Sequence, residues 1–198
     1  MPTMGSRDLV MLLISLGGNG QLDQSLGGVT RLTKYLFLLE KEGGVQAEGD
    51  AFRFEPYKAG PFSAKLYDDL EFLENLGLLE SHVTGNATEE EAAEVERLNI
   101  DDLFHDPATD TESSQSGDIY ADAYEEREFS LTEAGVNQIQ KFVADPEYRP
   151  VVDAVRRVKS RFANHSLNDL LRYVYDKYPE MATESEIRDK VMRRGRIG

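Results

Sequence analysis

The chain of 198 residues contains no cysteine, no tryptophan and only three histidines. Without cysteine it forms no disulfide, no thiolate metal site and no cysteine nucleophile. The histidines, His82, His105 and His165, are far apart in the sequence, and none has a second ligand at the spacing of a metal site. We therefore expect no bound metal and no cofactor.

Enzyme signatures are missing as well. The sequence has no phosphate-binding loop ending in Gly-Lys-Ser/Thr, no dinucleotide-binding glycine motif and no nucleophile elbow. Clusters of carboxylates such as Asp68-Asp69 and Glu89–Glu91 are more often solvated helix faces than catalytic pairs. We predict that the protein is not an enzyme and has no catalytic residues.

Long hydrophobic runs are also absent. The longest, Leu9–Leu16, is far shorter than the roughly 20 apolar residues with which a helix crosses a bilayer. The flanking Arg7 and Asp8 make a poor start for a signal peptide, so we interpret the run as a buried helix. We expect no membrane association and a cytoplasmic location, which the lack of cysteine also suits.

Charge is plentiful but unevenly placed. The net charge is −15, and residues 84–126 alone hold 14 acidic side chains against one basic side chain. Residues 149–198 hold 12 basic and 7 acidic side chains. We interpret 84–126 as an acidic insertion that is disordered in part; a solvated loop and a salt-tolerant source would each explain such acidity.

The hydrophobic periodicity and the capping residues predict a series of helices and three short strands. Ser6 and Thr132 are the expected N-caps of the first helix and of the helix after the insertion, and Gly17–Gly28 is expected to be a loop. The buried face of the helix after Thr132 is predicted to be Val136, Ile139, Phe142 and Val143. The predicted helices cover residues 7–16, 29–42, 63–75, 132–143, 151–161, 167–178 and 183–193, and the predicted strands are 52–54, 78–83 and 127–131.

The order of these elements indicates the fold class α+β. A glycine-capped helix followed by a strand, a long tip and a returning strand is typical of a winged helix-turn-helix domain. We predict a winged-helix core over residues 7–143, with 84–126 as an acidic wing insertion, and a C-terminal helical extension over 149–195. An ordinary α+β domain with a single hairpin is the alternative.

Two runs of residues carry a family resemblance. Thr30–Leu38, read as TRLTKYLFL, is similar to a helix of YwgA-like proteins, and Phe54–Ser63, read as FEPYKAGPFS, is similar to their Gly-Pro-aromatic-Ser turn. Leu66–Leu70 and Leu76–Leu79 continue the likeness, which covers roughly residues 7–143. More distantly, the chain resembles the Panacea domain of SocA-type antitoxins. The resemblance implies a winged-helix fold and, through its antitoxin members, a role in binding a toxin protein.

Two groups of residues are candidates for binding. The Gly-Pro turn is either a structural start of the third helix or part of a partner-binding surface, and the basic C-terminal helices either contact nucleic acid or pair with the chain's own acidic residues. The partner-binding candidates are Tyr57, Lys58, Phe62, Ser63, Lys65, Asp68 and Asp69, and the nucleic-acid-binding candidates are Arg156, Arg157, Lys159, Arg161, Arg193 and Arg194.

Charge ranks the two functional hypotheses. The third helix is expected to expose Lys65, Asp68, Asp69, Glu71, Glu74 and Asn75, and its four carboxylates would repel the phosphates that dominate DNA affinity. We therefore expect a non-enzymatic regulatory module that binds a partner protein, either a toxin or a second copy. The alternative is a DNA-binding transcriptional regulator, acting as a homodimer. The aromatic-rich helix 167–178 is either part of the core or a dimer surface.

Overall fold

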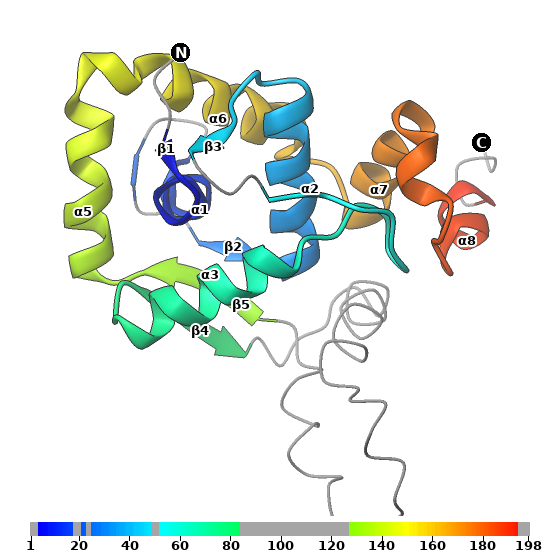
Figure 1. The fold of residues 1–198 in the computed structure, drawn as a ribbon, viewed down its shortest axis with the longest axis horizontal. Coiled ribbons are helices and arrows are strands. Elements are labelled where there is room, and N and C mark those ends of the chain that lie inside the picture. Colours follow the sequence, from blue (N-terminus) through cyan, green and yellow to red (C-terminus); the bar gives the residue numbers. More distant parts are fainter. Residues whose placement is uncertain (1–3, 18–20, 23–24, 49–51, 84–126, 194–198) are drawn as a thin grey trace, which may run out of the picture.

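The computed structural model describes residues 4–17, 21–22, 25–48, 52–83 and 127–193 (Figure 1). Their architecture is mixed α+β, which confirms the predicted fold class. The helices are α1 Ser6–Ser15, α2 Val29–Lys41, α3 Ala64–Asn75, α5 Glu133–Ala144, α6 Arg149–Phe162, α7 Leu167–Lys177 and α8 Arg188–Arg193, with 3-10 turns at Pro146–Tyr148 and Pro179–Ala182. The strands are β1 Met4–Gly5, β2 Leu26–Gly27, β3 Ala47–Glu48, β4 Leu79–Val83 and β5 Arg127–Leu131.

Helix α1 lies at the centre of the molecule. Figure 1 looks along its axis, with α5, α6 and α2 around it and the β4–β5 strands below. The side chains of Leu9 to Ile14 are all 0% exposed. A helix that is apolar on every side must be covered on every side, so the prediction of a buried helix is confirmed.

The main sheet has the strand order β2-β5-β4. β4 and β5 are antiparallel, with Leu79 opposite Leu131 and Val83 opposite Arg127, so the predicted pairing of these two segments is confirmed. On the other edge of β5, Leu26 lies opposite Phe129 and forms β2, in a segment that was expected to be a loop. A second pair, β1 with β3, is parallel and was not predicted.

A close contact joins the hairpin to α5. Gly77 has a φ of 66°, and the Leu78 N–H donates to the Leu73 carbonyl at 3.0 Å, so α3 ends in a Schellman motif. The Thr132 hydroxyl donates to the Gly77 carbonyl at 2.7 Å and accepts from the Gly135 N–H at 3.2 Å. Thr132 is therefore the N-cap of α5, as predicted, and it also fixes α5 against the end of α3.

The predicted strand over residues 52–54 is wrong. Arg53 has a φ of 48°, which is a left-handed conformation, so the backbone cannot run extended through it. The two phenylalanines that suggested alternation pack instead on an aromatic cluster. Phe54 lies edge-to-face on Phe37, with ring centroids 5.4 Å apart, and Phe52 lies 5.8 Å from Phe54.

Three smaller predictions are also corrected. Ser6 is the first residue of α1 and makes no cap, because the N-cap position is Gly5. The last helix is shorter than predicted, since residues 183–187 form turns and α8 begins only at Arg188. On α5 only Ile139 of the predicted apolar face is fully buried, and its other three members are partly exposed.

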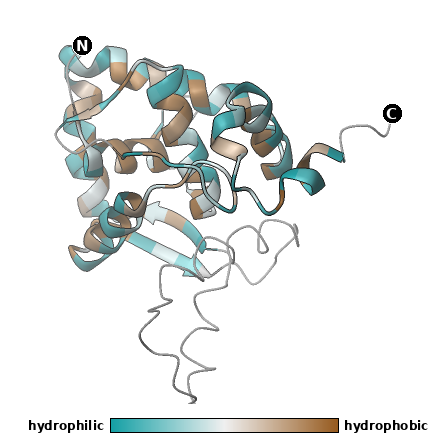
Figure 2. Ribbon diagram, turned by 45° about the vertical axis from the view of Figure 1, so that its right-hand side comes forward, coloured by the Kyte–Doolittle hydropathy of each residue, from teal (hydrophilic) through white to brown (hydrophobic). Residues whose placement is uncertain are grey.

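The C-terminal helices pack directly on the rest of the chain. α6 contacts α1 and α2, and α7 contacts α2. In Figure 2 the apolar residues gather where these helices meet, and the helix at the C-terminal end is largely hydrophilic. Among the described helices, none combines the length and the apolar character that crossing a membrane requires. The predicted insertion 84–126 lies outside the described residues.

Candidate functional site

The Gly-Pro turn contacts two core helices and the segment that contains Phe52. The Lys34 side chain of α2 is 1% exposed, and its Nζ donates to the Pro61 carbonyl at 2.9 Å. Gly60, with a φ of 86°, lies against the Tyr175 ring of α7, and the Ser63 hydroxyl donates to the Phe52 carbonyl. The two runs that carry the family resemblance therefore contact each other, and these contacts favour the structural interpretation of the turn.

Burial divides the predicted partner-binding residues. Phe62 and Ser63 are buried, whereas Tyr57, Lys58 and Lys65 are half-buried. Phe62 packs between the Tyr57 and Tyr67 rings, with centroids 4.7 and 5.5 Å away. The Lys58 carbonyl accepts from the Glu186 N–H at 2.9 Å, so the segment between α7 and α8 lies over this turn. Among the seven candidates only Asp68 is well exposed.

Asp69 was expected to be exposed, and that prediction is wrong. Its carboxylate is 0% exposed and accepts from Arg7 Nε at 3.0 Å and from Lys65 Nζ at 3.0 Å. Asp69 lies three residues after Leu66 and four before Leu73, which places it on the buried stripe of α3. The positive charges of Arg7 and Lys65 are therefore paired within the protein.

The exposed side of α3 combines carboxylates with apolar side chains. Phe72 is 39% exposed and Leu76, at the C-cap, is 57% exposed. The Arg7 guanidinium lies 3.4 Å from the centroid of the Phe72 ring, which holds that ring in place. We call this surface the α3 face; it consists of Asp68, Glu71, Phe72, Asn75 and Leu76.

The basic residues of α6 mostly make contacts within the chain. Lys159 Nζ donates to the carbonyls of Leu13 and Ile14, at 2.9 and 3.0 Å, and so caps the C-terminus of α1. Arg161 pairs with Glu42 at 2.9 Å, and Arg156 lies 3.4 Å from Asp153. Arg157 is exposed. In α8, Arg193 pairs with Asp189 at 3.7 Å, and Arg194 lies outside the described residues.

Glu42 holds α7 against the end of α2. Its carboxylate accepts from the hydroxyls of Tyr173 and Tyr178, at 2.8 and 3.1 Å, and from Lys177 Nζ at 3.0 Å. Burial alone would raise the pKa of Glu42, but these hydrogen bonds outweigh burial and lower it. The aromatic side chains of α7 thus point into the molecule, which favours the core interpretation of that helix over a dimer surface.

Lys159 provides a test of the α6–α1 contact. Burial lowers its pKa from 10.5 to about 8. Between these two pH values the unfolded chain holds a proton that the folded chain has released, so folding becomes more favourable as the pH rises. We expect the free energy of unfolding to increase across pH 8 to 10.5 relative to a Lys159→Met variant, by at most about 1.4 kcal/mol per pH unit. Urea unfolding at several pH values measures this difference, and parallel pH curves for the two proteins would contradict it.

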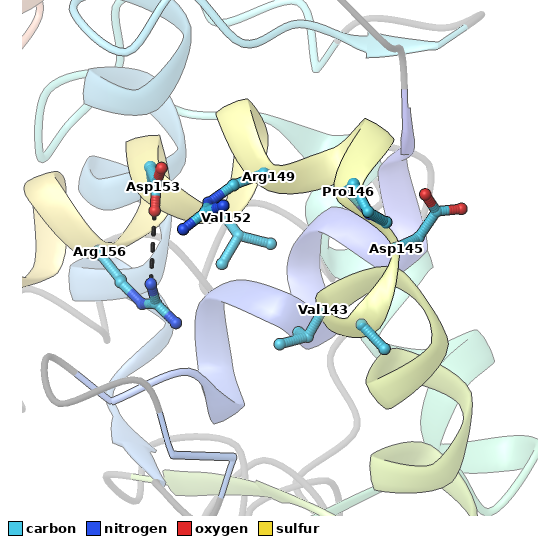
Figure 3. Close-up of a pocket in the computed structure, with 8 residues that line it drawn as sticks. Val143, Asp145, Pro146, Arg149, Val152, Asp153 and Arg156 are labelled. Atoms are coloured by element: carbon cyan, nitrogen blue, oxygen red, sulfur yellow. Dashed lines mark hydrogen bonds and ion pairs between the residues drawn. The ribbon is translucent and has the colours of Figure 1, made fainter.

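A groove runs along the corner between α5 and α6. It consists of two hollows of about 240 and 360 Å³, and Val143 and Ala144 line both of them. Figure 3 shows the smaller hollow, with Arg149, Val152, Asp153 and Arg156 on α6 and Val143 on α5. The larger hollow continues past Val136 to Leu22. We call this feature the α5–α6 groove.

Comparisons with known proteins add no identification. No family model, no curated protein and no solved structure matches the chain. In the part of the chain that the structure describes, no group of three or more histidine, cysteine or carboxylate side chains is placed to hold a metal ion. The family resemblance of the two sequence runs stays a prediction.

Proposed function

We propose that this protein is a regulatory module with a winged-helix core that acts by binding a partner protein through the α3 face. The winged-helix part of the proposal is supported by the order α1–β2–α2–β3–α3–β4–β5, in which β2 joins the outer edge of the hairpin and β3 pairs with β1 in a separate sheet. In such domains the helix before the hairpin is the usual recognition helix. That helix is α3 in this chain.

The charge of the α3 face is the observation that carries the choice of partner. Asp68 and Glu71 are exposed on it, while the neighbouring Arg7 and Lys65 are bound to the buried Asp69. A helix whose exposed charges are carboxylates, and whose neighbouring cations are paired within the protein, repels the phosphates of DNA. Exposed Phe72 and Leu76 beside those carboxylates suit a protein surface that is both apolar and basic.

The DNA-binding alternative has less support. It depended on the basic residues of α6, and Lys159 and Arg161 are held by the carbonyls of α1 and by Glu42. A cation that is already paired gains little by moving to a phosphate, because it must first leave its own partner. The family resemblance implies a toxin as the partner. Because that toxin is a protein, the resemblance agrees with the proposal of a protein partner.

Charge reversal on α3 tests the proposal. We expect the double variant Asp68→Lys/Glu71→Lys to lose a protein captured from lysate of the source organism, and to bind that protein, once purified, about tenfold more weakly or worse. Leu76→Ala should weaken binding without changing the charge. Asp176→Lys/Glu180→Lys, on exposed residues at the end of α7 and just beyond it, is the matched control and should bind normally.

The same experiment measures nucleic acid. If the unaltered protein enriches salt-sensitive DNA, and Arg157→Glu reduces that enrichment while the α3 variants do not, the protein-partner proposal is wrong. Circular dichroism of each variant separates a lost contact from a lost fold. If a partner binds both double variants equally well, its contact does not lie on the α3 face.

A further inference from the structure

One end of the α5–α6 groove is lined by two arginines and two aspartates. Arg149 and Arg156 both line its smaller hollow, and Asp153 is the carboxylate that lies beside them. Asp145 also belongs to the lining, but its side chain accepts from the Glu147 N–H at 2.9 Å and points away from the two guanidinium groups in Figure 3. Asp153 is ion-paired with Arg156, and Arg149 has no ion pair among the described residues.

Arg156 is incompletely hydrogen-bonded. Its contact with Asp153 is long, at 3.4 Å, and its Nε–H is buried without a hydrogen-bond partner among the described residues. A buried N–H of a charged group that makes no hydrogen bond destabilises the protein. A ligand oxygen that this guanidinium can reach by rotating would supply the missing acceptor and recover that free energy. Arg149 is exposed, lies two turns earlier on the same helix, and is on the same side of the hollow.

The rest of the groove is mainly apolar, and Gln140 is the polar residue among those that line the larger hollow. Val152 forms part of the smaller hollow, and Val143 leads from there into the larger hollow, where Leu22 and Val136 are partly exposed. Val136 and Val143 belong to the face of α5 that was predicted to be buried, and it is this groove that leaves them uncovered. A ligand that follows the groove meets cations first and aliphatic side chains afterwards.

We propose that the α5–α6 groove binds an aliphatic monocarboxylate of medium chain length. Arg149 and Arg156 hold its carboxylate, since guanidinium groups match the geometry of carboxylate oxygens, and the chain lies over Val143 toward Leu22 and Val136. A single negative charge would pair with Arg149, whose guanidinium has no ion pair among the described residues. A phosphate group, with a charge near −2, would also face Asp153. The site is separate from the α3 face, so the two proposals can fail independently.

Octanoate is the probe that we would use, with octylamine and 1-octanol as analogues of equal chain length. Octanoate is titrated into the full chain, and its binding is measured by calorimetry and by the NMR signals of the Val143 and Val152 amides. Both measurements should show saturable binding. Octanol should bind at least about tenfold more weakly, and octylamine should not bind, because each lacks the carboxylate that pairs with arginine. Butyrate should bind more weakly than octanoate, since it cannot reach the larger hollow.

Three methionine variants locate the site. Arg156→Met and Arg149→Met should each weaken octanoate binding about tenfold or more, and Arg157→Met, an exposed neighbour on the same helix that does not line the groove, should leave it unchanged. Arg149 is exposed, so its replacement should keep the fold even if Arg156→Met does not. Three results would each overturn the proposal: no saturable octanoate binding, equal affinity for octanol, or an equal loss in Arg157→Met.

Discussion

Replacing Gly135 with alanine should destabilise the protein, although alanine is the better helix former by about 1 kcal/mol. A methyl group at position 135 would overlap the Leu78 carbonyl oxygen, and it would lie 3.3 Å from the Leu131 side chain. The overlap is with backbone that is already fixed, because the Leu78 carbonyl accepts from the Thr132 N–H at 3.1 Å. The contact can be relieved only if α5 moves away from the hairpin.

The overlap with fixed backbone puts the overpacking cost at the upper end of its usual range, about 3 kcal/mol, and the helix preference returns about 1 kcal/mol, so we expect a net loss of about 2 kcal/mol. For a chain of this size the melting temperature should fall by roughly 4–8 °C. Ala134→Gly, at the exposed neighbouring position, is the control and should cost about 1 kcal/mol through helix preference alone. A Gly135→Ala protein that melts higher than the unaltered protein would show that α5 does not press on Leu78.

Replacing Gly60 with alanine should cost about 3 kcal/mol, from two sources. The residue has a φ of 86°, and a left-handed conformation costs a side-chain-bearing residue about 1–2 kcal/mol. In addition, its Cβ would lie 2.6 Å from Cε1 of the buried Tyr175 ring, so the turn or α7 must shift. Denaturation by urea measures the loss.

Gly44→Ala separates these two sources. Gly44 has a φ of 65°, and an added Cβ there would have no neighbour within 4 Å, so only the backbone cost applies. The difference between the two variants is then the contribution of the Tyr175 contact. Equal losses in Gly60→Ala and Gly44→Ala would mean that α7 does not depend on the turn.

The sequence was sufficient to predict the parts of the fold that depend on residues close together in the chain. The Thr132 cap, the glycine at the end of α3 and the strand over 127–131 each depend on residues within one turn or one strand, and their predictions are confirmed. The two-residue strands β1, β2 and β3 are different. Each exists because a distant segment pairs with it, and two residues carry no periodicity that would reveal it.

Buried charges were the main failure of the site prediction. Asp69 is predicted to be exposed, Lys159 is a predicted nucleic-acid contact, and Lys34 has no predicted role. Asp69 and Lys34 are instead fully buried, and Lys159 caps a central helix. A signal for Lys159 was present, since it follows Val155 by four residues and precedes Phe162 by three, which places it on the apolar stripe of α6. Its acceptors, the carbonyls of residues 13 and 14, could not be found from spacing alone.

The encirclement of α1 has a consequence for the synthesis of the chain. α1 leaves the ribosome before every helix that covers it, and α6, which begins at Arg149, is the last of them to be made. Until then the most apolar segment of the described chain lacks part of its cover and is exposed to chaperones and to other nascent chains. Lys159, which closes the end of α1, comes later still. The helix at the centre of the finished protein is thus synthesised before the helices that cover it and is among the last segments to be buried.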